Sequence, residues 1–382
     1  MMTQYSRTAM KWTFAISGIL LMLLLIAYLV PVQNILLWDF RNNLWAPAHL
    51  LVSGQSPYVI TGMFPDSNAV WFPMAIGAFF PLGWLNLTQA SMFWLLATVA
   101  AAIILIFLSA GESRPKFLLL AISLMMIFIQ PRVYAHLKLG QVTIFATLLF
   151  LLAAYALKDR KFFWTAVLLS VALSKPQLGV FVVPGIFLSV YRWRGKKGTL
   201  FLGGYFVLML GLLSLPLFLA YPSWWEGFIW ALNRNHAWLQ PTIYSLLPRF
   251  WGKWEGLAVW SVLAILLFVI NLHAWWIWPP QKAIYWSLAL TPLVTPYLWS
   301  WDIVLVLPLL IRALFELNTK KAHILLIGGY MLSWWLTLQV LLRTDSSDHY
   351  FWWTPWMLVL LILSSYWVDG RRLESFLKPN MA

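Results

Sequence analysis

Thirteen stretches of apolar residues alternate with polar segments along the chain. An isolated strand cannot satisfy its backbone hydrogen bonds in lipid, so we expect each stretch to be helical. Several are shorter than the roughly 20 residues that a perpendicular transmembrane helix needs. The pattern predicts an all-α, polytopic membrane protein, folded as one integral membrane domain over residues 1–382. The stretches lie near 13–32, 70–87, 90–109, 117–130, 141–157, 162–174, 177–190, 199–220, 256–273, 283–299, 302–315, 322–342 and 354–368.

Basic residues orient these segments, because Lys and Arg collect in cytoplasmic loops. Both ends of the chain are basic, which predicts two cytoplasmic termini and an even number of spans, about twelve, with at least one short or re-entrant segment. Three basic runs are also expected inside. They are Lys158–Lys161, Arg192–Lys197 and Lys320–Lys321.

Two arrangements of the short segments remain open. In the first, segment 70–87 does not fully cross the membrane; in the second, 162–190 forms one broken span. The first places more basic residues on the cytoplasmic side, so we favour it. Both place the long loops 33–69 and 221–255 on the extracytoplasmic face, with surface helices expected in the first. The first apolar run is longer than a signal peptide's core and has no A-x-A site after it, which favours a retained first span.

Composition excludes a soluble enzyme, because hydrophobic residues make up 62% and charged residues 10%, against about 25% charged in soluble domains. The net charge of +14 is better explained by membrane topology than by nucleic-acid binding. The chain has no cysteine, which excludes disulfides and thiol catalysis. Its 27 Trp fit aromatic belts at the membrane surface, or sugar-stacking surfaces.

The first external loop carries the best candidate for a general base. Asp39 follows the first span directly, where a carboxylate can take a proton from a substrate hydroxyl. Alternatively, Asp39 caps a helix or pairs with Arg41. Tyr58 ends a Gly-x-x-Pro-Tyr stretch, which fits a substrate contact or simply a tight turn.

Lys175 precedes Pro176 between two short apolar segments, with no basic run around it. An isolated cation within the membrane is usually functional. Its natural partner is an anionic group such as a lipid phosphate, although it could also snorkel to the interface. Asp302 starts an apolar run, and we favour a helix-capping role for it.

Two further polar segments offer substrate contacts. Residues 131–141 hold Arg132 and Gln141, which suit a phosphate or sugar if the segment is external, and an ordinary positive loop if it is internal. Loop 221–255 holds His236 and Arg249 among several Trp and Asn residues, which suit a lipid-linked sugar or an interfacial amphipathic helix.

The sequence lacks a P-loop, a GxGxxG in a strand–helix setting and an HExxH motif. No predicted cytoplasmic loop is long enough for a nucleotide-binding domain. We therefore expect neither cofactor nor metal, and a substrate that arrives already activated through the membrane or from outside.

The chain resembles the bacterial glycosyltransferase family 87, polyprenol-phosphate-mannose-dependent transferases of the GT-C superfamily. Five short blocks carry the resemblance, in the family's order, between about residues 36 and 312. They are Asp39-Phe40-Arg41 with Gly54 to Tyr58; Trp71-Phe72-Pro73 with Pro81-Leu82; Gly140-Gln141; Ser174-Lys175-Pro176; and Thr295-Pro296-Tyr297 with Asp302.

The resemblance implies a GT-C-type helix bundle in the plasma (inner) membrane, with an active site on the extracytoplasmic face. It implies transfer of a hexose, mannose foremost, from a polyprenyl-phosphate-linked donor to a glycan or glycolipid acceptor, with inversion. Asp39 would be the base and Lys175 would meet the leaving phosphate, with Arg132 and Arg249 as helpers.

Two positions depart from the family pattern. Phe72 stands where the family often has Pro, and residues 233–237 lack the family's Asn-x-Ser element, so acceptor recognition cannot be carried over. The main alternative is a transporter or flippase of a lipid-linked sugar, but no internal repeat is visible and the polar residues cluster near one face. A polymerase or ligase of lipid-linked glycans would share the external site.

Overall fold

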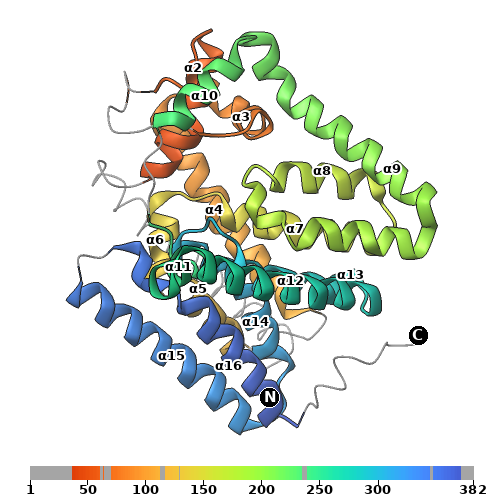
Figure 1. Ribbon diagram of the computed structural model, residues 1–382, viewed down its shortest axis with the longest axis vertical. Coiled ribbons are helices and arrows are strands. Elements are labelled where there is room, and N and C mark those ends of the chain that lie inside the picture. The colour runs from red at the N-terminus through yellow and green to blue at the C-terminus, as the bar shows by residue number, and fades with distance from the viewer. Residues whose placement is uncertain are drawn as a thin grey trace, which may run out of the picture.

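A computed structural model describes residues 37–60, 63, 70–111, 117–128, 130–234, 239–344 and 347–370. These residues form a bundle of helices joined by short connections (Figure 1). In chain order the elements are η1 (Phe40–Trp45), α2 (Ala46–Val52), α3 (Pro73–Phe79), η2 (Phe80–Trp84), α4 (Leu87–Ala110), α5 (Phe117–Phe128), α6 (Pro131–Leu139), α7 (Thr143–Lys158), α8 (Phe162–Ala172), η3 (Pro176–Gly179), α9 (Val182–Ala220), α10 (Trp224–Arg234), α11 (Ile243–Trp251), α12 (Lys253–Ile277), α13 (Pro280–Val294), η4 (Ser300–Leu305), α14 (Leu307–Glu316), α15 (Lys320–Arg343), η5 (Asp348–Phe351) and α16 (Thr354–Val368).

The prediction that the apolar stretches are helical is confirmed from residue 70 onward, and the stretch 13–32 lies outside the described residues. Within the described part, five segments are long and apolar enough to cross a membrane: α4, α9, α12, α15 and the run Asp348–Val368. Helices α5 and α6, bent by 65° at their junction, would make a sixth. The chain is thus a helical membrane protein, and a total of about twelve spans stays a prediction.

Short helices run back and forth between the two ends of the bundle. Helix α7 leads away from Thr143, α8 returns towards Lys175, and α9 leads away again before a break at Gly195, where the backbone is non-helical (φ 61°, ψ −160°). Figure 1 shows α7 and α8 side by side and α9 turning back at the edge of the molecule. Lys158 and Arg160 therefore share a pocket with Trp193, which argues against 162–190 as one broken span.

Residues 70–87 pack beside the first loop, and the expectation that they do not fully cross the membrane stays a prediction. His49 of α2 donates a hydrogen bond from Nδ1 to the Gly83 carbonyl, 2.9 Å away. The helices η1 and α2 were expected on the surface, but most of their residues are buried. The reason is aromatic packing: Phe40 stacks on Trp94 of α4 at 4.9 Å between ring centroids.

A buried polar chain ties α9, α12 and α13 together. Trp275 Nε1 donates to Ser287 Oγ at 2.6 Å, Ser287 Oγ donates to Asn271 Oδ1 at 2.6 Å, and Asn271 Nδ2 donates to the Phe181 carbonyl at 2.9 Å. Gly185 lets the indole approach closely, because a Cβ there would lie 2.2 Å from Trp275 Nε1. Satisfied bonds of this kind fix the register of helices that apolar packing alone would leave free to slide.

Candidate functional site

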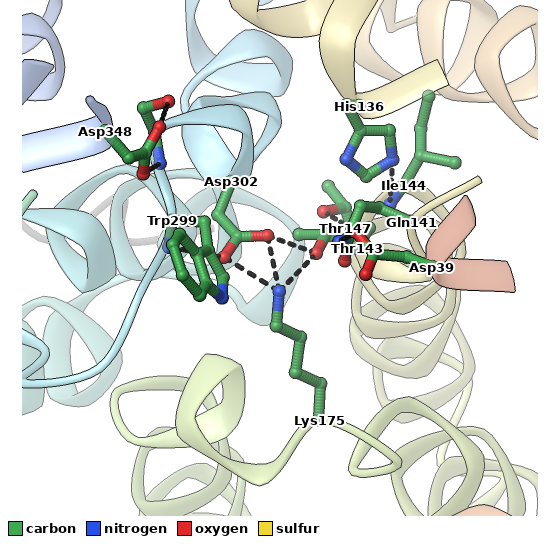
Figure 2. A network of polar contacts seen from close by, with 11 residues as sticks. Asp39, His136, Gln141, Thr143, Ile144, Thr147, Lys175, Trp299, Asp302 and Asp348 are labelled. Carbon is green, nitrogen blue, oxygen red and sulfur yellow. Dashed lines mark hydrogen bonds and ion pairs between the residues drawn. The ribbon is translucent and has the colours of Figure 1, made fainter. Parts of the chain in front are cut away.

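An ion pair lies at the centre of a buried polar network (Figure 2). Lys175 Nζ donates to both oxygens of Asp302, at 2.6 and 2.8 Å, and to Thr143 Oγ1 at 3.2 Å. The Thr143 hydroxyl donates to Asp302 Oδ1 at 2.5 Å. The side chains of Lys175 and Asp302 are 7% and 0% exposed. Such a pair persists away from water because each charge is matched and hydrogen-bonded.

Three helix ends bring these residues together. Thr143 is the first residue of α7, and Lys175 occupies the turn between α8 and η3, where Pro176 prevents the helix from continuing. Asp302 lies in the first turn of η4 and accepts the Trp299 backbone N–H at 3.0 Å. The predicted capping role of Asp302 is therefore confirmed, but the same carboxylate is also the counterion of Lys175.

The Asp39 carboxylate lies beside this pair, partly exposed. One of its oxygens accepts Asn43 Nδ2 at 2.9 Å, and the other accepts the side-chain amide of Gln141. Burial raises the pKa of Asp39 to about 6, against the lowering effects of Lys175, Gln141 and Asn43, while the charge of Asp302 raises it further. A carboxylate with this pKa is a stronger base than an exposed aspartate and is still ionised at neutral pH.

Close packing fixes Asp39 against Gln141. Leu37 adopts a left-handed backbone (φ 58°) and donates its N–H to the Lys138 carbonyl at 2.6 Å. Gly140, also left-handed (φ 71°), ends α6 where a Cβ would lie 2.7 Å from Phe40 Cβ. The Gly140-Gln141 and Asp39-Phe40 motifs are thus two sides of one contact. Residues 131–141 accordingly lie at the same end of the bundle as Asp39, and an extracytoplasmic position for this end stays a prediction.

Arg132 belongs to a neighbouring cluster. Its Nη1 lies 3.5 Å from Asp348 Oδ1, and its guanidinium lies 3.4 Å from the centre of the Phe351 ring. Asp348 also accepts the Ser300 backbone N–H at 2.8 Å and the Ser300 hydroxyl. Arg132 therefore links α6 to the segment that carries Asp302, and this bridging contact is its visible role.

His136, one helical turn after Arg132, supports the same junction from the interior. Its Nε2 accepts the Ile144 backbone N–H at 3.3 Å, so the neutral ring carries its proton on Nδ1. The side chain is fully buried. His136 thus ties α6 to the first turn of α7, directly behind Thr143 (Figure 2).

Aromatic side chains flank the ion pair. Trp299 and Trp301 stack with their ring centroids 5.0 Å apart and nearly parallel. Tyr297, 43% exposed, lies within electrostatic reach of both Asp302 and Asp39; burial of its hydroxyl is the main cause of its raised pKa. A partly open aromatic wall next to a base suits a ligand with apolar ring faces.

Four further residues were predicted to contact the substrate: Arg41, Tyr58, His236 and Arg249. Tyr58 is fully buried, and its hydroxyl donates to the Trp71 carbonyl at 3.3 Å. Arg249 is exposed in the last turn of α11, while burial lowers the pKa of Arg41 in η1. His236 lies outside the described residues. A substrate-binding role for each of these four stays a prediction.

Lys175 was expected to be an isolated cation, and this is wrong: Asp302 and Thr143 hold it. A buried lysine needs a counter-charge, so a partner among the 12 acidic residues could have been expected, but the rule does not single out Asp302. Asn43, Thr143 and His136 carried no comparable signal. Within the described residues, no group of three or more His, Asp or Glu side chains could hold a metal ion.

Comparison with known proteins places this chain in a family. No curated protein and no solved structure matches the chain. A family model described as "Glycosyltransferase family 87" matches residues 72–296, more than half of the chain. The match contains Arg132, Gln141 and Lys175, whereas Asp39 precedes it and Asp302 follows it. With this match and its apolar helices, the chain is a membrane glycosyltransferase that belongs to glycosyltransferase family 87.

Proposed function

We propose that the protein transfers a hexose, mannose foremost, from a polyprenyl-phosphate sugar to an acceptor hydroxyl on the extracytoplasmic face of the membrane, with Asp39 as the general base. The observation that carries this proposal is the position of Asp39. Its carboxylate is partly exposed, has a pKa raised to about 6 and lies beside the buried Lys175–Asp302 pair.

The proposed reaction uses this arrangement. Asp39 accepts the proton of the acceptor hydroxyl, and the hydroxyl oxygen forms a bond to the anomeric carbon of the sugar. The bond from that carbon to the phosphate oxygen breaks, and its electron pair leaves with the polyprenyl phosphate. Attack from the face opposite the phosphate inverts the anomeric carbon. Gln141 and Asn43 orient the carboxylate and leave it lone pairs for the acceptor.

Lys175 is the group that meets the leaving phosphate. Its ammonium has three N–H donors, and in this structure three oxygens of Asp302 and Thr143 occupy them. The phosphate therefore either exchanges with one of these oxygens or is stabilised by Lys175 through charge alone. In both cases a fixed cation stabilises the negative charge that develops on the leaving group.

Tyr297, Trp299 and Trp301 supply the wall for the sugar ring. The stacked indoles present apolar faces, and Trp299 is coupled to the ion pair because its backbone N–H donates to Asp302 Oδ2. Asp39 and Tyr297 are both partly exposed, so the hydroxyl groups of sugar and acceptor can approach them. An accessible base beside an aromatic wall favours a transferase over a transporter. A transporter needs residues that couple ion and substrate movement, but it needs no base that can reach a substrate hydroxyl.

The test is incubation of the purified protein with a panel of polyprenyl-phosphate hexoses and glycolipid acceptors, scored by release of polyprenyl phosphate and by the anomeric configuration of the product. We expect one hexose, mannose foremost, to react with inversion. Use of a nucleotide sugar, or retention of configuration, would contradict the proposal.

The role of Asp39 is tested by Asp39→Asn, with Asp159→Asn as the matched control, since Asp159 is exposed at the far end of α7. We expect transfer to be lost in the first variant and kept in the second, with both proteins folded. Near-normal turnover of Asp39→Asn would remove Asp39 as the base.

A further inference from the structure

A second polar feature lies at the opposite end of the short helices from the candidate site. It is a pocket of about 260 Å³ lined by Lys158, Arg160, Trp193, Pro279, Pro280 and Gln281. These residues come from the end of α7, the turn after it, the middle of α9 and the start of α13. Helix α7 begins at Thr143 in the candidate site and ends at Lys158 in this pocket, so a full helix length separates the two.

The lining of the pocket is basic. Lys158 and Arg160 contribute positive charge, and the lining contains no acidic residue. Asp159 is the nearest carboxylate in the sequence, and it pairs with Lys161 at 3.5 Å, with both side chains more than half exposed. Arg192, Arg194, Lys196 and Lys197 flank Trp193 along α9. Lys282 lies just beyond Gln281, over the Trp278 ring at 4.6 Å. The pocket is therefore suited to an anion.

The backbone at Arg160 supports a binding role for its side chain. Arg160 adopts a left-handed conformation (φ 58°), which glycine adopts without cost and arginine rarely does. Its N–H bonds to the Leu157 carbonyl at 2.9 Å and closes the turn after α7. A glycine would make this turn more easily, so a residue kept there against its preference points to a use for the guanidinium.

The setting of the pocket points to a lipid rather than a soluble anion. Trp193 forms part of its wall, and Phe163, Trp164 and Trp276 on the adjacent helices are 42%, 56% and 46% exposed. Tryptophan and basic residues together are typical of the headgroup level of a bilayer. The buried Oε1 of Gln281 accepts no hydrogen bond within the described residues, and this carbonyl oxygen can accept one from a headgroup hydroxyl.

We propose that this pocket binds the phosphate headgroup of an anionic membrane phospholipid. Lys158 and Arg160 contact the phosphate, Trp193 and the neighbouring aromatic side chains contact the upper acyl chains, and Gln281 contacts the headgroup. The lipid then bridges α7, α9 and α13 at the end of the bundle opposite Asp39. This proposal does not depend on the transfer reaction, because it concerns binding alone.

The experiment is native mass spectrometry of the full-length protein in a neutral detergent, titrated with phosphatidylglycerol and, in parallel, with phosphatidylcholine. We expect the wild-type protein to retain phosphatidylglycerol preferentially. The double variant Lys158→Gln/Arg160→Gly should bind it at least about tenfold more weakly. Arg160→Gly alone should weaken binding several-fold while keeping the fold, since glycine accepts the left-handed turn.

The matched control is Lys320→Gln/Lys321→Gln, which removes two positive charges from exposed positions at the start of α15. It should leave phosphatidylglycerol binding nearly unchanged. Equal weakening by both double variants would show general attraction to basic surface instead of a site, and would overturn the proposal. Displacement of the lipid by glycerol phosphate at similar concentration would overturn it as well, because the pocket would then hold a soluble phosphate.

Discussion

Both oxygens of the Asp302 carboxylate accept hydrogen bonds from Lys175 Nζ, at 2.6 and 2.8 Å, although 127 positions separate the two residues in the sequence. Neither side chain has appreciable contact with water. The pair joins the turn after α8 to η4 and holds these two segments together at the centre of the candidate site.

The first prediction concerns the stability of this pair. Lys175→Met and Asp302→Leu each leave one buried charge without its partner, and each should destabilise the fold by about 3–5 kcal/mol. The double variant removes both charges and should lose much less than the sum. Thermal unfolding in detergent measures the effect. Additive losses in the double variant would show that the two side chains do not interact energetically.

The second prediction concerns pH. Asp39 must be ionised to accept a proton, and its pKa is about 6, so transfer should fall as the pH drops through about 6 rather than near the ordinary value of 3.8. Since the charge of Asp302 raises the pKa of Asp39, Asp302→Asn should shift this acid limb to lower pH. The rate of transfer against pH is the measurement.

The control for this pH experiment is Asp348→Asn, which loses the same charge but breaks contacts to Ser300 and Arg132 instead. Its acid limb should stay near that of the wild-type protein even if its rate falls. An Asp302→Asn profile that keeps the wild-type limb, at whatever rate, would rule out electrostatic control of the base by Asp302.

The third prediction tests how Asp39 is positioned. Gly140→Ala places a Cβ 2.7 Å from Phe40 Cβ and 2.9 Å from the Leu37 side chain, in a left-handed backbone that alanine disfavours. We expect a loss of stability of about 1–3 kcal/mol and a larger loss of kcat than of donor affinity. Gly54→Ala is the control, since Gly54 is also left-handed but has no atom within 4 Å of the added Cβ. A full rate with Gly140→Ala would show that the contact does not position the base.

The fourth prediction concerns the core. Ser287→Ala removes the hydroxyl that joins Trp275 Nε1 to Asn271 Oδ1 and leaves both without that partner. We expect a cost of about 1–3 kcal/mol. Ser261→Ala in α12 removes a hydroxyl that bonds only to the Leu257 carbonyl of its own helix, and should cost clearly less. Equal costs would show that the chain across α9, α12 and α13 adds nothing to stability.

The helices were predictable because a segment in the bilayer must satisfy its own backbone hydrogen bonds, and a helix does so. Apolar runs such as 322–342 and 354–368 correspond closely to α15 and α16, and the basic runs correctly placed Lys158 and Trp193 at one end of the bundle. The predicted stretches 177–190 and 199–220 correspond to the two arms of α9, which the non-helical backbone at Gly195 separates. The exact position of that break was not predictable, because a change in one backbone conformation has no counterpart in average hydropathy.

The part of the candidate site that consists of ionisable residues was the easiest to predict. Asp39 and Lys175 stand out because the chain has few ionisable residues, and Gln141 came from a short motif. The pairing of Lys175 with Asp302 depends on three helix ends that meet in space, which no local pattern encodes. Tyr58 shows what a local motif leaves out: the turn motif does not indicate that Tyr58 is buried or that its hydroxyl donates to the Trp71 carbonyl, and a substrate contact by Tyr58 stays a prediction.

The length of α7 has a consequence inside the protein. Its 16 residues rise about 24 Å, and most of them are buried against neighbouring helices. One end of this helix carries Thr143, in the candidate site, and the other carries Lys158, in the basic pocket. A displacement of α7 along its axis would therefore move both places at once, so that what binds at one end of the helix can act on the geometry at the other.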